Sequence, residues 1–333
     1  MRIGGYAAGL ATIAFLTGPA EALETDQFYA WTRPLNDAAE AINQRINADI
    51  DEALARVNAR HDAASCPCRT AEHAIRDHFD YAIIARPELW ATKTSFLERI
   101  PATSEEEPEF RRRYLYGATS PLDPVLWMPP SPTIEIAGVR AGVDKLGHFF
   151  SDGAWAEGAY RRALSKGSSE DGAIRQAVQY DIATERTIWG RGTSGIMSLA
   201  DLEANYQGLL FYRGLCGGPH PALTRTPAGW RLERPFDIRE YVSPEWDESW
   251  EPNIYTRSRW AKVKPVMLRY CALLRNPEIQ RQRAAYAARD RETYTETMIH
   301  GLVASGKLAD PSQFTIEAVC GALPSEEPPG SGR

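Results

Sequence analysis

Three stretches near the middle of the chain decide its fold class. They read DKLGHFFSDGAWAEGAYRRAL over residues 144–164, EDGAIRQAVQYDIATERTIW over residues 170–189 and SLADLEANYQGLLFYRG over residues 198–214. In each stretch apolar residues recur at intervals of three and four, the period of a helix with one buried face. The glycine-rich link from Gly190 to Gly195 separates the second stretch from the third. The centre of the chain is therefore predicted to form three consecutive helices.

The flanking sequence extends this helical pattern toward both ends. Residues 34–60 place their isoleucines on one stripe, which predicts a long amphipathic helix, and further helices are expected over about 70–100 and 259–307. Residues 228–258 are rich in aromatic residues and prolines and alternate weakly in twos, which is typical of extended chain or a hairpin. We expect a mainly α protein, a single large helical domain over residues 23–324 with a small extended or hairpin insertion.

The two ends of the chain have the composition of segments outside the folded domain. Residues 1–22 combine a positive charge at Arg2, an apolar run and Ala20-Glu21-Ala22, the small-x-small pattern of a signal-peptide cleavage site. The run is shorter and richer in glycine than a spanning helix, so we expect cleavage rather than an uncleaved anchor. Residues 325–333 have the composition of a disordered tail. These features predict export to a periplasmic or extracellular location.

The composition of the mature chain limits its partners. After the signal there is no run of about 18 apolar residues, so no transmembrane segment is expected there. The formal net charge is -6, and a mildly acidic protein has no electrostatic attraction to nucleic acid. Glycan or lipid of the cell envelope is the partner class that fits an exported protein of this kind.

The cysteines predict disulfides. All five lie in the mature region, at Cys66, Cys68, Cys216, Cys271 and Cys320. Because an exported protein meets an oxidising compartment, two disulfides and one spare thiol are expected. Cys66 and Cys68 flank a single proline and are poorly placed to bond each other, so each is expected to reach a distant partner. Five choices of the free cysteine and three connectivities for each leave fifteen schemes open.

Polar residues on the three central helices form the candidate site. Asp144 and His148 lie four residues apart on one face, as do Asp201 and Asn205, and Glu185 lies near the end of the helix between them. If these faces converge, an imidazole, carboxylates and an amide share one pocket. Such a set can bind a divalent cation or perform acid/base catalysis.

The same residues also suit a structural role. Asp144 is placed to be an N-cap, and Ser198 with Asp201 three residues later resembles a capping box. His148 and Asn205 would then be buried polar groups that tie the helices together through hydrogen bonds. The sequence favours this network, with a catalytic or metal site as the alternative. No cofactor is predicted, and a divalent metal is the alternative.

The order of these residues resembles a known pattern. Asp144-Lys145-x-x-His148-Phe149, then Glu185, then Ser198-x-x-Asp201-x-x-x-Asn205-x-x-Gly208 is similar to the pattern of VanZ-like proteins and of the small YfiM-type envelope lipoproteins. The resemblance covers about residues 143–214. It implies a cell-envelope setting and, for VanZ-like members, an association with glycopeptide resistance. This chain departs from the pattern by lacking membrane-spanning helices, because charged residues interrupt the first helix of the motif.

Two further motifs are expected to be structural. Residues 190–195 match the GxGxxG dinucleotide pattern, but they follow a helix rather than a strand, so we expect a turn between helices. Cys66, Cys68, His73 and His78 suggest zinc, yet the two histidines are five residues apart, about 140° around a helix. Disulfides and surface histidines are expected there instead.

The aromatic segment offers a second kind of site. Its rings could stack on sugars, with Trp246 and Trp250 as the candidate glycan-binding residues, although packing against the helices is favoured. The neighbouring acids Asp247, Glu248 and Glu251 are expected to be solvated.

These observations predict a secreted or periplasmic envelope protein of structural or binding type, with a buried polar cluster on its central helices. Two alternatives stay open. One is a metal-dependent hydrolase of envelope lipid or glycan that uses the central polar residues. The other is a glycan-binding module that uses the tryptophan-rich segment.

Overall fold

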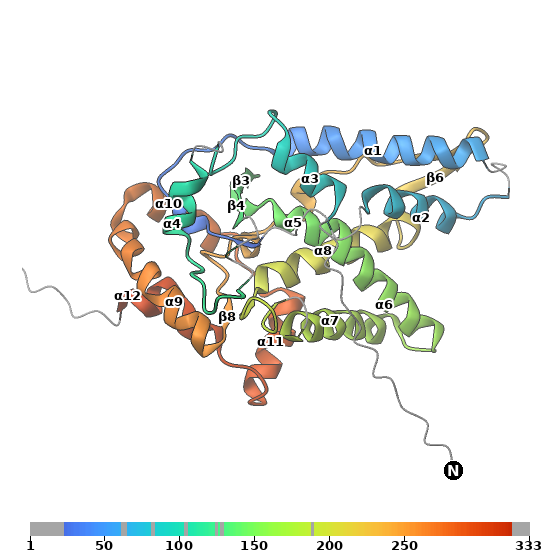
Figure 1. Ribbon diagram of the computed structural model, residues 1–333. Coiled ribbons are helices and arrows are strands. Elements are labelled where there is room, and N and C mark those ends of the chain that lie inside the picture. The colour runs from blue at the N-terminus through green and yellow to red at the C-terminus, as the bar shows by residue number, and fades with distance from the viewer. Residues whose placement is uncertain are drawn as a thin grey trace, which may run out of the picture.

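The computed structural model describes residues 23–60, 65–80, 84–102, 106–123, 126, 130–187 and 190–321. The predicted signal peptide, residues 1–22, and the predicted tail, residues 325–333, lie outside them. The described chain is mainly α-helical, which confirms the predicted fold class (Figure 1). Among its helices, none has both the length and the apolar character to span a lipid bilayer.

The N-terminal part is built on one long helix. The predicted amphipathic helix forms as α1 (Ala39–Arg60), and it buries its isoleucine stripe completely. α1 packs along α2 (Cys68–Phe79) at one end of the molecule (Figure 1). The shorter helices α3 (Arg86–Lys93) and α4 (Glu107–Arg113) follow.

All three predicted central helices form. The first is a continuous run of α5 (Asp144–Gly147), a π-helical turn η3 (His148–Asp152) and α6 (Gly153–Ser165). The second is α7 (Glu170–Thr187) and the third is α8 (Leu199–Cys216). α6 packs against both α7 and α8 (Figure 1). A π-helical turn is rare and is often found at functional sites, and here it contains His148.

The first and third central helices cross with their backbones in contact. A Cβ atom at Gly208 would lie 2.0 Å from the carbonyl oxygen of Phe149, and one at Gly153 would lie 2.6 Å from the Cα atom of Gly208. Only glycine fits at both positions, because any side chain would force the helices apart. The crossing therefore brings the polar face of η3 against the polar face of α8.

Short strand pairs join distant parts of the chain. β1 (Leu23–Thr25) runs parallel to β2 (Pro130–Ser131), and β5 (Ile196–Met197) is antiparallel to β8 (Ile254–Tyr255). β3 (Thr133–Ile136) and β4 (Val139–Gly142) form an antiparallel hairpin just before the first central helix.

The predicted insertion over residues 228–258 is only partly extended. A hairpin of β6 (Leu223–Thr226) and β7 (Gly229–Leu232) begins before it. Within it, the two short 3-10 helices η4 (Ile238–Glu240) and η5 (Pro244–Trp246) replace the expected extended chain.

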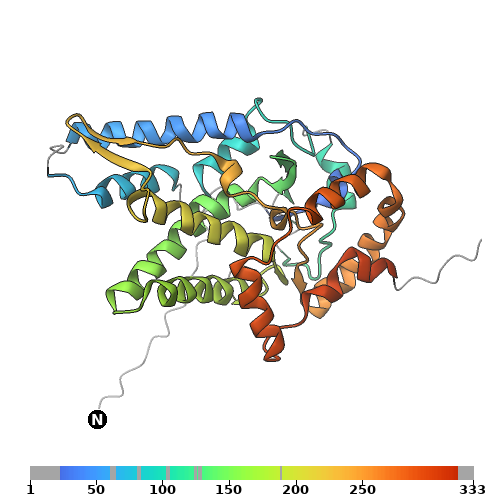
Figure 2. The same cartoon turned by 180° about the vertical axis from the view of Figure 1, so that it is seen from behind.

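The C-terminal helices gather at the end of the molecule opposite α1 and α2, as both views show (Figures 1 and 2). They are α9 (Arg257–Met267), the 3-10 helix η6 (Leu268–Arg275), α10 (Pro277–Ala287), α11 (Tyr294–Ala304), the 3-10 turn η7 (Pro311–Phe314) and α12 (Ile316–Gly321). Asp290 lies in the connection between α10 and α11. α8 connects the two ends, because Phe211 belongs to the hydrophobic cluster around α1 and α2, whereas Leu202 belongs to the cluster of the C-terminal helices.

Two disulfides cross-link this fold. Cys68–Cys216 joins α2 to the end of α8, and Cys271–Cys320 joins η6 to α12. Cys66 is a buried free thiol. Two bridges and one spare thiol agree with the prediction. The expectation that Cys66 also reaches a distant cysteine is wrong, because Cys216 is bonded to its neighbour Cys68.

Candidate functional site

Lys145 lies at the centre of the candidate site. Its side chain is fully buried, and Nζ lies 2.8 Å from Asp144 Oδ2, 2.5 Å from Asp201 Oδ1 and 2.6 Å from Glu248 Oε1. An ammonium group carries three protons, so it can satisfy three carboxylates at once. We refer to these four residues together with His148 as the Lys145 cluster. It joins α5, α8 and the segment after η5.

Asp144 links the cluster to the N-terminal strand. The prediction that it caps its helix is wrong, because the N-cap position is Val143 and Asp144 is the first residue of α5. Its Oδ1 atom accepts hydrogen bonds from the hydroxyls of Thr25 at 2.7 Å and Ser131 at 2.9 Å. These two residues face each other in the β1–β2 pair. Asp144 therefore has partners on both carboxylate oxygens.

Glu248 supplies the third carboxylate from a segment expected to be exposed. That expectation is wrong for all three acids, because Asp247, Glu248 and Glu251 are 1%, 5% and 8% exposed. The second oxygen of Glu248, Oε2, accepts hydrogen bonds from the Tyr116 hydroxyl at 2.6 Å and from Asn253 Nδ2 at 2.8 Å. Burial is tolerated because every oxygen has a donor from elsewhere in the chain.

His148 is the member of the cluster that reaches solvent. Its side chain is 22% exposed, with Nε2 3.2 Å from Asp201 Oδ2 and Nδ1 2.9 Å from Asp152 Oδ2. The π-helical turn places Asp152 against this ring. Burial alone would lower the pKa of His148, but Asp201 and Asp152 outweigh it and raise this pKa well above its usual value. The ring is therefore an imidazolium held between two carboxylates.

Asn205 lies beside this imidazolium, as the four-residue spacing from Asp201 predicts. Its side-chain amide is 3.2 Å from His148 Nδ1. With its nitrogen turned toward η3, the amide donates to the carbonyl oxygens of His148 at 3.2 Å and Asp201 at 3.1 Å. Asn205 thus fastens α8 to the π-helical turn.

The start of α8 is capped differently from the predicted capping box. Ser198 is the N-cap, and its hydroxyl accepts the N–H of Asp201 at 3.1 Å. The return bond does not go to Asp201, because the Ser198 N–H donates to Glu185 Oε1 at 3.2 Å. This exchange leaves the Asp201 carboxylate available for Lys145 and His148. Glu185 lies behind the cap rather than in direct contact with the imidazole.

The centre of the cluster is charged at neutral pH. Burial would raise the pKa of Asp201, but His148 and Lys145 outweigh it and hold this pKa below its usual value. Burial would lower the pKa of Lys145, but Asp144, Asp201 and Glu248 raise it well above its usual value. Lys145 and His148 are therefore cations, and Asp201 is an anion between them.

Three neighbouring acids have a raised pKa. Burial and the charge of Asp201 raise the pKa of Glu185 to about 8, and they also raise the pKa of Glu24 well above its usual value. Burial and the charge of Asp152 raise the pKa of Asp181 in the same direction. The site is thus an ion-paired centre surrounded by buried acids whose pKa is raised.

Two overlapping groups of ligand atoms could approach one metal ion. They are Asp144, His148 and Asp201, and Glu24, Asp144, Asp201 and Glu248; within each group the atoms lie within 4.8 Å of one another. Lys145 Nζ already forms ion pairs with three of these carboxylates. A divalent cation would therefore have to displace the ammonium group from the second set.

The candidate glycan-binding tryptophans differ in exposure. Trp246 is fully buried, with its ring centroid 5.9 Å from that of Phe149, so no sugar can stack on it in this conformation. Trp250 is half-buried, and the guanidinium of Arg283 lies 4.9 Å from its ring centroid. The favoured expectation of core packing agrees with this placement for Trp246.

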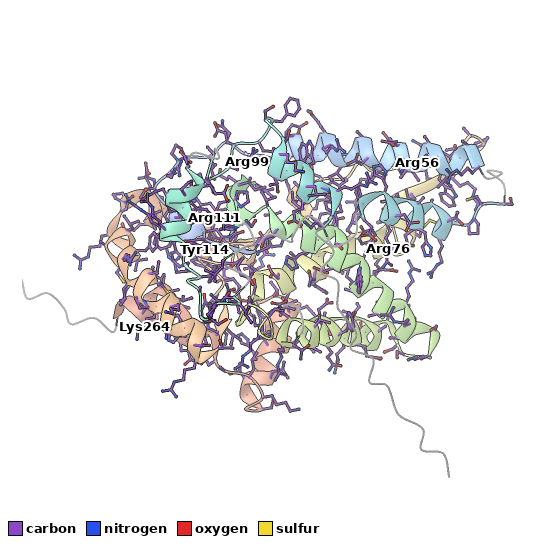
Figure 3. All side chains as sticks on the ribbon, in the orientation of Figure 1. Arg56, Arg76, Arg99, Arg111, Tyr114 and Lys264 are labelled. Carbon is purple, nitrogen blue, oxygen red and sulfur yellow. A yellow bond between two sulfur atoms is a disulfide. The ribbon has the colours of Figure 1, made fainter. Side chains whose placement is uncertain are left out.

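The glycine-rich link over residues 190–195 and the cysteine and histidine set over residues 66–78 have structural roles. A Cβ atom at Gly190 would lie 2.1 Å from Glu185 Oε1, so this glycine lets the link between α7 and β5 pass close to the buried acid. Cys68 is in a disulfide, and the zinc set is therefore incomplete. His73 is exposed as expected, but His78 is buried, 3.2 Å from Asp49 Oδ1 and in contact with Arg56. Figure 3 labels Arg56 on α1.

Five residues of the site are missing from the sequence prediction, namely Glu24, Lys145, Asp152, Asp181 and Glu248. Two of them carry a usable signal: Lys145 lies within the quoted motif, and Asp181 lies four residues before Glu185 on the same helix face. Asp152 depends on the π-helical turn, whereas Glu24 and Glu248 come from distant segments.

Comparisons with protein-family models, with curated proteins and with solved structures find no match to this chain.

Proposed function

We propose that this chain is an exported cell-envelope protein of structural or binding type, and that its Lys145 cluster holds the central helices together rather than catalysing a reaction. The position of Lys145 carries the proposal. Its ammonium group lies within ion-pair distance of Asp144, Asp201 and Glu248. A buried charge that is paired with three carboxylates, and hydrogen-bonded to two of them, cannot act on a substrate without breaking the network.

The surroundings of His148 support the same role. Both ring nitrogens face carboxylates, Nε2 facing Asp201 and Nδ1 facing Asp152. A general base needs a nitrogen lone pair directed at the substrate, and an imidazolium with two carboxylate partners has none. The two disulfides are in keeping with an oxidising compartment, and envelope glycan or lipid is the proposed partner class.

The test begins with the full chain expressed in a bacterium. Fractionation is expected to recover the protein outside the cytoplasm with both disulfides formed. The purified protein is then sedimented with insoluble cell wall and, separately, floated with phospholipid vesicles. Binding to either supports the proposal and separates glycan from lipid. Cytoplasmic recovery of the reduced protein, or binding to neither material, would contradict it.

A hydrolase is the second candidate, and one observation favours it. His148 is partly exposed and its charge acts on Glu185 behind the helix cap, whose pKa of about 8 is suited to proton transfer near neutral pH. Asp144, His148, Glu185 and Asp201 would then be the ligands or acid/base groups, with a divalent metal as the implied cofactor.

His148→Gln separates the two functions. The structural role predicts a lower Tm for the variant and no turnover of envelope lipid or glycan by either protein, with or without divalent metal. The hydrolase predicts turnover by the parent protein that His148→Gln lacks while its Tm stays nearly unchanged. Metal analysis of the purified chain gives an independent reading, because a hydrolase of this kind would hold a stoichiometric ion.

A further inference from the structure

A groove lies between α7 and α11, away from the Lys145 cluster (Figure 1). Each helix lines it with one stripe of side chains, over residues 175–186 on α7 and 297–305 on α11. Its volume is about 470 Å³. Sites for small molecules typically occupy roughly 300–1,000 Å³. We call this space the α7–α11 groove.

The floor of the groove is apolar. Ile182 belongs to the hydrophobic cluster of the C-terminal helices, and the partly buried side chains of Met298 and Leu302 pack against that cluster. Ala183, which also lines the groove, is exposed. An apolar ligand placed here would extend the core and remove this surface from water.

Gly301 leaves space open in the wall that α11 contributes. It lies inside this helix, and a Cβ atom built on it would meet no atom of the described chain within 4 Å. Its φ is also not in the left-handed region. A glycine inside a helix weakens that helix relative to alanine. Neither packing nor backbone conformation therefore requires glycine here, whereas an occupant of the groove would.

Three cationic side chains line the groove, namely Arg175, Arg186 and Lys307. Within the described part of the chain, no acidic side chain lines it, and none of the three cations is in an ion pair. Arg186 Nη2 donates to the Lys307 carbonyl oxygen at 3.1 Å, which brings two of the cations to one end of the groove. On a chain with a formal net charge of -6, this surface is complementary to a negative ligand.

A lipid fits this space better than an acidic peptide does. Two turns of a helical peptide about 10 Å across take up roughly 850 Å³, which is more than the groove holds. An extended peptide pairs its backbone with a strand edge, and both walls of this groove are helices. An acyl chain has no polar backbone groups that need partners.

We propose that the α7–α11 groove binds one molecule of an anionic lipid. The acyl chain lies against Ile182, Met298 and Leu302, and the acidic headgroup is held by the cations that line the groove. The inference rests on the proposed function for the partner class, envelope lipid, and it assigns that partner to a surface. It involves no residue of the Lys145 cluster.

The experiment titrates the full chain with decyl phosphate, kept below the concentration at which it forms micelles. Calorimetry is expected to show one site per chain. Decyl maltoside has the same chain and a neutral headgroup, so it should bind at least about tenfold more weakly. Inorganic phosphate should show no binding over the same range. No binding of decyl phosphate would overturn the proposal, and equal affinity for the two amphiphiles would overturn the assignment of an anionic ligand.

Gly301→Leu fills the groove and should lower the affinity for decyl phosphate at least about tenfold. Its Tm should equal or exceed that of the parent protein, because leucine favours a helix more than glycine does. Gly301→Ala is the matched control, because it strengthens the helix but fills little of the groove. It should bind within about threefold of the parent. If Gly301→Leu bound as tightly as Gly301→Ala, the ligand would lie elsewhere and the proposal would be overturned.

Arg175→Gln and Lys307→Gln each remove one cation from the groove. At least one of them should weaken the binding of decyl phosphate severalfold and leave that of decyl maltoside unchanged. Lys264→Gln, at an exposed lysine of α9, is the matched control and should bind like the parent. Unchanged affinity in both groove variants would overturn the role given to these charges.

The outcomes also separate this inference from the proposed function. If the parent protein and Gly301→Leu floated equally well with phosphatidylglycerol vesicles, the groove would be overturned and the proposed function would stand. Cytoplasmic recovery of a chain that binds decyl phosphate in the groove would contradict only the proposed function. Binding of an acidic amphipathic peptide without binding of decyl phosphate would replace the lipid by a protein partner and overturn the inference.

Discussion

The ammonium nitrogen of Lys145 lies 2.5 Å from Asp201 Oδ1, and the other oxygen of the same carboxylate lies 3.2 Å from His148 Nε2. One carboxylate on α8 therefore holds two cations from the first central helix. The close crossing at Gly153 and Gly208 makes this contact attainable, because it removes the side chains that would separate the two backbones. The charge network and the helix crossing depend on each other.

Replacement of Lys145 is expected to be severely destabilising. Lys145→Met keeps the length of the side chain but leaves Asp144, Asp201 and Glu248 facing one another without a cation. Removal of one partner from a buried ion pair typically costs about 3–5 kcal/mol. Urea unfolding of the purified chain should show a loss of this size in the free energy of unfolding.

Lys264→Met is the matched control, because Lys264 is exposed on α9 (Figure 3). It should change the free energy of unfolding by less than about 0.5 kcal/mol. A Lys145 variant as stable as this control would show that the buried carboxylates are neutralised by protons and that the ion pairs contribute little.

Stability is expected to fall as the pH rises from acidic to mildly alkaline values. Burial raises the pKa of Glu185 from 4.5 to about 8 and that of Asp26 from 3.8 to about 7. An acid with a raised pKa binds its proton more tightly in the folded chain. Its stabilising contribution is thus complete below the unfolded pKa and is lost as the pH rises through the folded pKa. Tm should be lower at about pH 8.5 than at about pH 5.5, by at least about 3 °C.

Glu185→Gln tests the cause of this slope. Gln imitates the protonated acid and can still accept the N–H of Ser198, so the variant should lose part of the pH dependence between about pH 5 and 8. Glu278→Gln, exposed on α10, should retain all of it. Below about pH 4 the sign reverses, because the pKa of Asp201 is held low by His148 and Lys145 and its ion pairs are lost on protonation. An unchanged slope in Glu185→Gln would exclude this residue as its source.

The prediction of the fold is based on helical periodicity. Where the prediction is wrong, there are physical causes. The buried stripes of α1, α7 and α8 recur every three or four residues, so they are visible without any partner. The π-helical turn covers only His148–Asp152, too short a stretch to disturb that pattern. The segment from η4 to Glu251 was expected to be exposed or extended, because its acids look like surface residues. The burial of Glu248 depends on donors contributed by other segments.

The site was predictable where its residues share a helix face. Asp144 and His148, like Asp201 and Asn205, converge because a spacing of four residues survives any packing of the helices. Lys145 lies in the same motif, but a lysine is rarely buried unless it is paired with acidic groups. The sequence alone does not show which acids pair with it. Glu248 is 103 residues away from it, and only the folded chain brings the two together.

The two tryptophans are expected to respond differently to truncation. Trp246 is fully buried against Phe149, so Trp246→Ala should cost about 3–5 kcal/mol of stability through the cavity it leaves. Trp250 is half-buried, with the guanidinium of Arg283 over its ring. Trp250→Ala should lower the free energy of unfolding by about 1–2 kcal/mol. Urea unfolding measures both. If Trp250→Ala instead abolished sedimentation with cell wall at unchanged stability, the glycan-binding alternative would gain direct support.

The disulfide that closes the longer loop should contribute more stability. Cys68–Cys216 spans 148 residues and Cys271–Cys320 spans 49. Loop-closure entropy corresponds to at most about 5 and about 4 kcal/mol, respectively. Paired serine substitutions should therefore lower the free energy of unfolding more for the first bridge.

Thiol titration should find one reactive group per chain in denaturant, at Cys66, and almost none in the folded protein, because Cys66 is buried. Rapid labelling of Cys66 without denaturant would contradict its placement in the core.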